Sequence, residues 1–134
     1  MAKFLTHRRE PFELDFLSFL VIVGIGQLIT GVRPGSIAAL LPPAINLLWL
    51  WMMTVGSAVA LLGIVVKNPV NGVYAESWGL LTSGMALLVY GAAQATFGGA
   101  SAVLAAAMTI GLVTAWVFRL AELRLVIKEL RGQL

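Results

Sequence analysis

The chain has 134 residues, of which 60% are hydrophobic and only 11% are charged. Soluble domains have about 45–50% apolar and about 25% charged residues. Nine basic and six acidic side chains are too few to cover a soluble core of this size. With a mean hydropathy of +0.95, the composition excludes an ordinary soluble enzyme, a disordered tail and a nucleic-acid-binding domain. It predicts an integral membrane protein.

Several kinds of chemical site are also excluded. The sequence has no cysteine, which rules out disulfides, thiolate metal sites and a cysteine nucleophile. Its one histidine, His7, cannot form a histidine metal cluster alone. There is no Walker-type phosphate loop and no motif of an intramembrane protease. We therefore expect no catalytic residue, no cofactor and no metal, and we expect that the protein is not an enzyme.

The first apolar stretch predicts a helix over residues 11–31. A bilayer core of about 30 Å needs roughly 20 helical residues, and residues 16–32 carry no charge. Pro11 is tolerated in a first helical turn, and Glu13 and Asp15 favour the positive end of the helix dipole. Gly31, followed by Arg-Pro-Gly, ends the helix.

The second uncharged stretch, residues 34–66, is longer than one straight span requires. Pro42-Pro43 divides it, because a proline disfavours helical conformation in the residue before it. We expect a short interfacial or re-entrant segment over residues 35–41, and a full span over residues 43–66.

The third uncharged stretch runs over residues 77–118 and would be about 63 Å long as one helix, twice the thickness of a membrane. Residues 67–72 before it contain Asn-Pro and Asn-Gly, which predict a polar connector. Gly98-Gly99 is the natural break, and it gives spans over residues 76–96 and 100–120. The predicted fold is all-α, a single polytopic membrane domain over residues 1–134 with four transmembrane helices.

Lysine and arginine predict the orientation of these spans. With four spans both termini lie on one side, and that side collects eight basic residues, whereas Arg33 lies alone on the other side. We therefore expect a multi-pass protein of the cytoplasmic membrane with both termini in the cytoplasm.

Small residues at helical spacing predict where the helices pack, because lipid gives little hydrophobic drive for association. These faces are either seams within one protomer or an oligomer interface, and the sequence does not separate the two. The candidates are Gly56, Ala60 and Gly63 on the second span and Gly84, Gly91 and Ala95 on the third.

Uncharged polar residues inside the spans are few. An amide in hydrocarbon needs a hydrogen-bonding partner, and Gln27 lies nearest the middle of the first span. Such residues either join two helices or line a hydrated path. The candidates for these roles are Gln27, Asn46, Ser57 and Gln94.

The last segment, residues 119–134, is predicted to be a cytoplasmic amphipathic tail. Its apolar residues continue a heptad pattern that begins inside the fourth span. The pattern comprises Val113, Trp116, Leu120, Leu123, Ile127, Leu130 and Leu134.

Basic residues flank this heptad pattern, and in a parallel self-coil they would oppose like charges. We expect instead that the tail lies on anionic lipid or binds a protein partner. Docking onto the N-terminal segment, through Phe4, Leu5 and Phe12, is the competing interpretation. The candidate contacts to lipid or partner are Arg119, Arg124, Lys128 and Arg131.

Charged residues near the spans argue against a proton-coupled transporter, which generally needs an ionisable group deep in the membrane. The charged residues lie at helix ends, and none is at mid-depth. Small multidrug exporters, which rely on a buried glutamate in their first span, are therefore a poor match. The residues concerned are Glu13, Asp15, Glu76, Arg119 and Glu122.

Residues 31–43, Gly-Val-Arg-Pro-Gly-Ser-Ile-Ala-Ala-Leu-Leu-Pro-Pro, are followed by a span that contains tryptophan. This region, mainly residues 31–66, resembles small four-span membrane proteins of actinobacterial phages, some of which are regarded as holin-like. The resemblance implies a homo-oligomer that perturbs the host membrane. The modestly basic tail and the lack of a second start methionine near Met1 depart from the pattern of dual-start holins.

Three hypotheses follow. The first is a holin-like protein that oligomerises in the cytoplasmic membrane and permeabilises it, with lysis as the outcome. The alternative is a non-catalytic structural or adaptor subunit whose tail binds a protein partner or lipid. The second alternative is a small channel or transporter. We expect membrane lipid and further copies of the chain as partners, and no nucleic acid.

Overall fold

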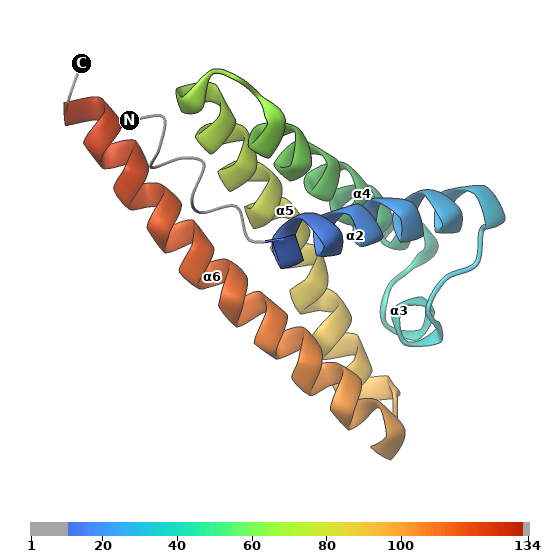
Figure 1. Ribbon diagram of the computed structural model, residues 1–134. Coiled ribbons are helices and arrows are strands. Elements are labelled where there is room, and N and C mark those ends of the chain that lie inside the picture. The colour runs from blue at the N-terminus through green and yellow to red at the C-terminus, as the bar shows by residue number, and fades with distance from the viewer. Residues whose placement is uncertain (1–10, 133–134) are drawn as a thin grey trace.

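A computed structural model describes residues 11–132, without the side chains of Ser101, Leu130 and Arg131. The described part of the chain is all-α (Figure 1). Four of its helices are long and apolar enough to cross a membrane, as the sequence predicts. In chain order the helices are α2 (Pro11–Thr30), α3 (Gly35–Leu40), α4 (Pro43–Val65), α5 (Pro69–Phe97), the 3-10 turn η1 (Ala100–Ala102) and α6 (Val103–Gly132).

The first two long helices begin and end within one residue of the predicted positions. α2 ends at Gly31. Its φ of 68° lies in the left-handed region, which glycine adopts at little energetic cost, and its N–H donates a hydrogen bond to the carbonyl of Gln27. α4 begins at Pro43, directly after Pro42. The segment between them forms the short helix α3, which packs on α5 and buries Ile37 completely.

α5 begins earlier than the sequence suggested. Its first residue is Pro69, so most of the predicted connector over residues 67–72 is helical. Asn68 causes this early start, because its side-chain oxygen accepts hydrogen bonds from the backbone N–H groups of Val70 and Asn71. The proline at the first helical position needs no such partner.

α6 is also longer than predicted. The turn at Gly98-Gly99, with Gly99 at a φ of 66°, separates it from α5 as expected. The helix then continues to Gly132, so the predicted fourth span and the predicted tail form one uninterrupted helix. The polar residues that follow Phe118 are exposed or turn toward other helices. α6 continues through this region without a break.

α4 and α5 pack most closely of all the helices. A side chain at Gly63 would collide with the backbone of Gly72 and Glu76, and one at Gly79 would collide with the backbone of Ala60. Gly56 lies in the same way against Gly79 and Ser83. The absence of side chains at these positions therefore sets the distance between the two helices.

α5 also packs against α6, with slightly more space. Gly84 lies against the ring of Trp116, and Gly91 lies against Thr109. Ala102 and Ala106 are buried. Ala95, which we grouped with these glycines, is exposed, and the buried alanine in this turn of α5 is Ala93.

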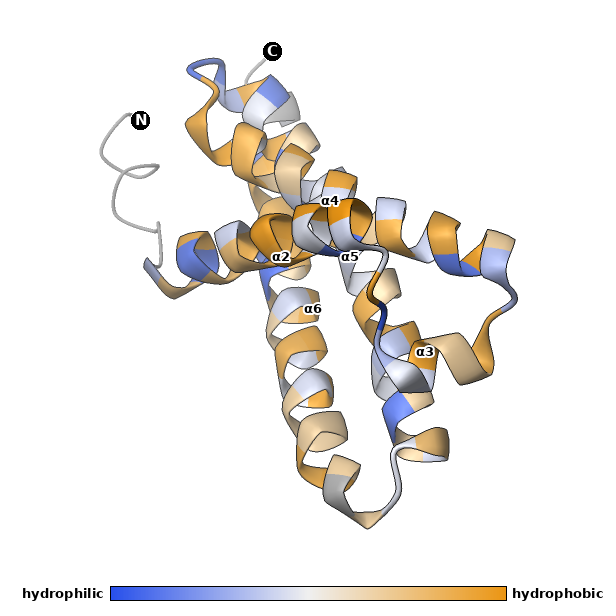
Figure 2. Cartoon of the chain, turned by 90° about the vertical axis from the view of Figure 1, so that its right-hand side faces the viewer, coloured by the Kyte–Doolittle hydropathy of each residue, from blue (hydrophilic) through white to orange (hydrophobic). Residues whose placement is uncertain are grey.

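α2 does not run alongside the other long helices. It lies across them at a steep angle in both views (Figures 1 and 2). Only Leu17, Leu20 and Gly24 are buried, and Gly24 meets the side chain of Thr54 on α4. Most of the α2 surface is therefore apolar and exposed.

The outer surface of the helices is apolar, as expected for contact with lipid tails. Figure 2 shows that hydrophobic residues are frequent in the long helices. Large side chains on this surface include Ile22, Leu48, Leu62, Leu104 and Phe118, each at least 59% exposed.

The close contact between α4 and α5 gives a direct test. We expect Gly63→Val to lower the free energy of unfolding by about 1–3 kcal/mol, because the new side chain overlaps the α5 backbone. Gly26→Val is the matched control, since Gly26 is also in a helix and has open space around it. Thermal unfolding in detergent, followed by circular dichroism, measures both. Equal melting temperatures for the two variants would contradict this packing.

Candidate functional site

The four candidate polar residues do not meet in one place. Ser57 is buried in the seam between α4 and α5, and its hydroxyl donates to the carbonyl of Met53 at 2.8 Å. Gln94 lies toward the far end of α5 and donates from Nε2 to the hydroxyl of Tyr90 at 2.7 Å. Gly56, beside Ser57, contacts Ser83, so Gln94 lies about 16 Å further along α5.

The other two candidates lie near helix ends. Asn46 is in the second turn of α4 and is 3% exposed, and Gln27 is half-buried in the last turn of α2. Within the described residues, their side-chain oxygens have no hydrogen-bond partner. In a single copy, therefore, these four residues do not line one continuous polar path.

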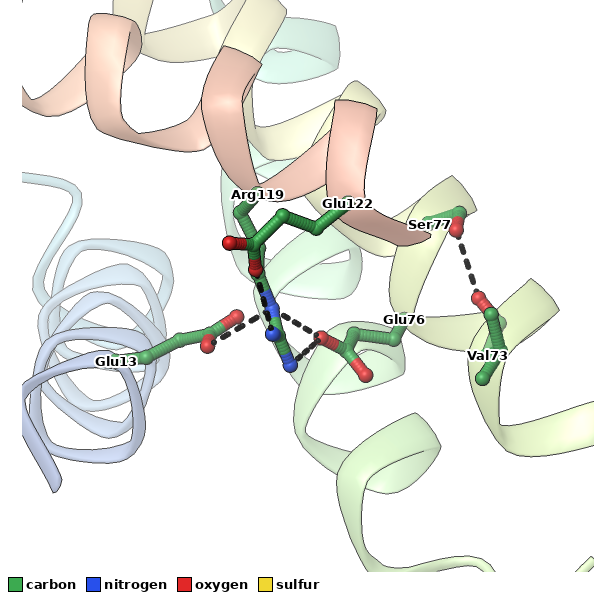
Figure 3. A network of polar contacts seen from close by, with 6 residues as sticks. All are labelled: Glu13, Val73, Glu76, Ser77, Arg119 and Glu122. Atoms are coloured by element: carbon green, nitrogen blue, oxygen red, sulfur yellow. Dashed lines mark hydrogen bonds and ion pairs between the residues drawn. The ribbon is translucent and has the colours of Figure 1, made fainter. Parts of the chain in front are cut away.

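The structure instead brings charged side chains from three helices around Arg119 (Figure 3). The Arg119 guanidinium donates to Oε1 of Glu76 on α5, from Nε at 3.0 Å and from Nη2 at 2.8 Å. Its Nε also lies 3.4 Å from Oε2 of Glu13 on α2. Its Nη1 lies 3.4 Å from Oε2 of Glu122, one turn further along α6.

Burial differs among the members of this cluster. The Glu76 and Glu13 side chains are 7% and 12% exposed, Arg119 is 20% exposed, and Glu122 is 48% exposed. Removing a carboxylate from water is costly unless a charged hydrogen-bonding partner replaces the water. The pair between Arg119 and Glu76 is therefore the central one, and Glu122 sits at its solvent-facing edge.

Aromatic packing one turn away places Arg119 in this position. Trp116 precedes Arg119 by one turn, and its ring covers Gly84 on α5. The same ring makes an edge contact with Phe16 on α2, with 6.0 Å between the ring centroids. Because Phe16 follows Glu13 by one turn, two successive turns of α2 meet two successive turns of α6.

The cluster has the chemistry of a structural clasp. If all four groups are ionised, one positive and three negative charges leave a net charge of −2. A guanidinium offers five donors in a planar fork, which allows one side chain to serve several carboxylates. Among residues 11–132, no group of three or more histidine, aspartate or glutamate side chains could hold a metal ion.

Arg119 was expected to contact lipid or a partner, but in the folded chain its side chain pairs with Glu76 and Glu13. The guanidinium turns toward Glu76 and Glu13 because these carboxylates lie at the same level of the bundle. Arg124 and Lys128 are exposed, as lipid or partner contacts must be. The side chain of Arg131 is outside the part that the structure describes.

The apolar side of the tail packs on its own chain. Trp116 and Leu123 are buried, and Leu120 and Ile127 pack partly buried against the same core. The heptad side of α6 therefore faces its own chain. Of the N-terminal segment that we considered as a docking surface, Phe4 and Leu5 lie outside the described residues, and Phe12 is 64% exposed.

The sequence contains a sign of this cluster, which the count of basic residues on each side of the predicted spans did not reveal. Glu13, Glu76, Arg119 and Glu122 all fall near those ends of their predicted helices that were expected to share one side of the membrane. Comparisons with family models, curated proteins and solved structures found no match for this chain.

Removal of the guanidinium tests the clasp. Arg119→Gln leaves the buried carboxylate of Glu76 without its cation, so we expect a loss of about 3 kcal/mol in the free energy of unfolding. The exposed Arg124 provides the control, and Arg124→Gln is expected to change the stability by less than about 0.5 kcal/mol. Chemical denaturation in detergent measures both.

A double variant separates the ion pair from general damage to the site. We expect the double variant, Arg119→Gln with Glu76→Gln, to lose less stability than the sum of the two single losses, because the buried charge of Glu76 is removed together with its cation. Strictly additive losses would show that Arg119 and Glu76 do not interact.

Proposed function

We propose that this chain is a holin-like protein of the cytoplasmic membrane, which associates with copies of itself and permeabilises the bilayer. The resemblance of residues 31–66 to small phage membrane proteins suggested this function, and the surface of α6 supports it.

The observation that carries the proposal is the side of α6 that points away from its own chain. Ala107, Gly111 and Ala115 follow one another in steps of four along this side, and all three are exposed. A side chain at Gly111 would meet open space. In a bilayer, such a row of small residues lets a second helix approach closely. It therefore supports contact between copies.

The α4–α5 seam of one copy is closed. Thr54, Ser57 and Ser83 lie buried near or in the α4–α5 seam, and each hydroxyl donates to the carbonyl one turn earlier in its own helix. Direct contact between the α4 and α5 backbones fills this seam. Permeabilisation therefore has to arise between copies and not through a single one.

The orientation is part of the proposal. Lys67, Arg124 and Lys128 are exposed, and the α4–α5 turn lies at the same end of the molecule as the C-terminal end of α6 (Figure 1). Basic residues at one end favour the cytoplasmic side of the membrane. We infer that both termini face the cytoplasm.

The two alternatives find less support in this arrangement. In the adaptor hypothesis the tail binds through the heptad side of α6, and this side is packed against its own chain at Trp116 and Leu123. A channel or transporter within one copy needs a path through the bundle, whereas its closest seam is formed by backbone contact.

Expression of two glycine variants tests the proposal. Induction of the wild-type chain in bacterial cells is expected to depolarise the membrane, as recorded with a potential-sensitive dye. Gly111→Leu should abolish this effect, because the bulky side chain keeps a second helix at a distance. Gly26→Leu is the matched control, since Gly26 is also exposed and helical, and it should depolarise like the wild type.

The protein level in the membrane has to be equal in the three strains, which quantitative blotting checks. Persistence of the membrane potential at high levels of the wild-type chain would reject the holin-like function. Full activity of Gly111→Leu would reject the role of this side of α6.

A further inference from the structure

The exposed half of α6 has two edges of different character. α6 runs along one edge of the molecule (Figure 1), with α5 packed on its inner side. Residues seven positions apart lie on the same side of an α-helix. Ala115, Glu122 and Glu129 therefore form one edge, and all three are exposed.

The second edge has the opposite charge. Val117 and Arg124 are seven positions apart, and Lys128 follows Arg124 by four, so these three share a side. All three are exposed. Two positions along a helix correspond to a turn of about 200°, so Val117 and Arg124 lie nearly opposite Ala115 and Glu122. Glu122 keeps its contact with Arg119 and is still 48% exposed.

In two parallel copies, the residues of the two edges lie at similar depths along the helix axis and have complementary sizes. Copies inserted in the same direction are parallel, so residues of similar number lie at similar depth. Glu122 and Arg124 then differ by about 3 Å along the axis, and Glu129 and Lys128 by about 1.5 Å. Within the membrane segment, the branched side chain of Val117 on one edge corresponds to the small side chain of Ala115 on the other.

We propose that neighbouring copies of this chain pack side by side through these two edges of α6, the acidic edge of one copy against the basic edge of the next. This inference rests on the proposed self-association and specifies its surface. Exposed ion pairs contribute little affinity each, so the close approach of Val117 to Ala115 supplies the attraction and the charges select the pairing.

Such an interface joins different surfaces of the two copies. Each copy of a pair then retains one unused edge, and further copies add until a ring closes or a row forms. A two-fold symmetric dimer would instead place Ala115 against Ala115. The two arrangements therefore predict different cross-links.

Cysteine cross-linking tests this arrangement directly, because the chain has no cysteine of its own. Ala115→Cys and Val117→Cys are placed in two differently tagged full-length copies, which are expressed alone and together and oxidised in membranes. We expect about tenfold more disulfide dimer in the mixture than in either variant alone, since only the mixture brings the two edges together.

Charge exchange in the same assay tests the selection of edges. Lys128→Glu alone and Glu129→Lys alone should each lower the dimer yield, because each places like charges opposite one another. The double variant should restore the yield. Lys67→Glu is the control, since Lys67 is exposed in the α4–α5 turn and should leave the yield unchanged.

Two results would overturn the proposal. One is cross-linking of Ala115→Cys with itself as efficiently as with Val117→Cys, and the other is no cross-linking in the mixture. Depolarisation is scored separately on cysteine-free chains. Cross-linking without depolarisation would reject the holin-like function alone, and depolarisation without cross-linking would reject this interface alone.

Discussion

The guanidinium of Arg119 decides how three of the long helices meet. Lipid tails give apolar helices little reason to prefer one another, so a charged hydrogen-bonding group near the membrane surface has a large influence on their arrangement. Glu76 on α5 and Glu13 on α2 both turn toward Arg119 on α6. Because Glu76 is almost completely buried, it stays ionised at little cost only when the cation of Arg119 is beside it. The ion pair thus fixes the register between α5 and α6.

The steep crossing of α2 follows from the same constraint together with the packing of α4. At its N-terminal end, Glu13 and Phe16 meet Arg119 and Trp116. Further along, Gly24 meets Thr54 on α4. These contacts lie on different neighbours, and α2 runs across the bundle between them (Figure 2). The close seam of α4 and α5 forms the platform on which α2 rests.

Much of this fold could be predicted from the sequence, because the limits of a membrane helix are set by local chemistry. Charge-free length gave the four long helices, and the Gly31, Pro42 and Gly98-Gly99 positions gave their ends. The start of α5 was missed because the capping effect of Asn68 outweighs the turn tendency of the Asn-Pro and Asn-Gly pairs. The cluster around Arg119 was missed for a different reason. Its members are separated by up to 109 positions in the chain (13 to 122). The heptad spacing marks the side of α6 that turns inward, but it predicts neither the crossing of α2 nor which carboxylates meet Arg119.

The distance between α2 and α6 in a lipid bilayer tests the role of Arg119 most directly. Spin labels at Asp15→Cys and Leu125→Cys, both exposed positions, report this distance by pulsed electron paramagnetic resonance in nanodiscs. The account predicts one narrow distance distribution in the otherwise wild-type chain, and a broad distribution shifted to longer distances when Arg119→Gln is added. An unchanged narrow distribution in the Arg119→Gln chain would contradict it.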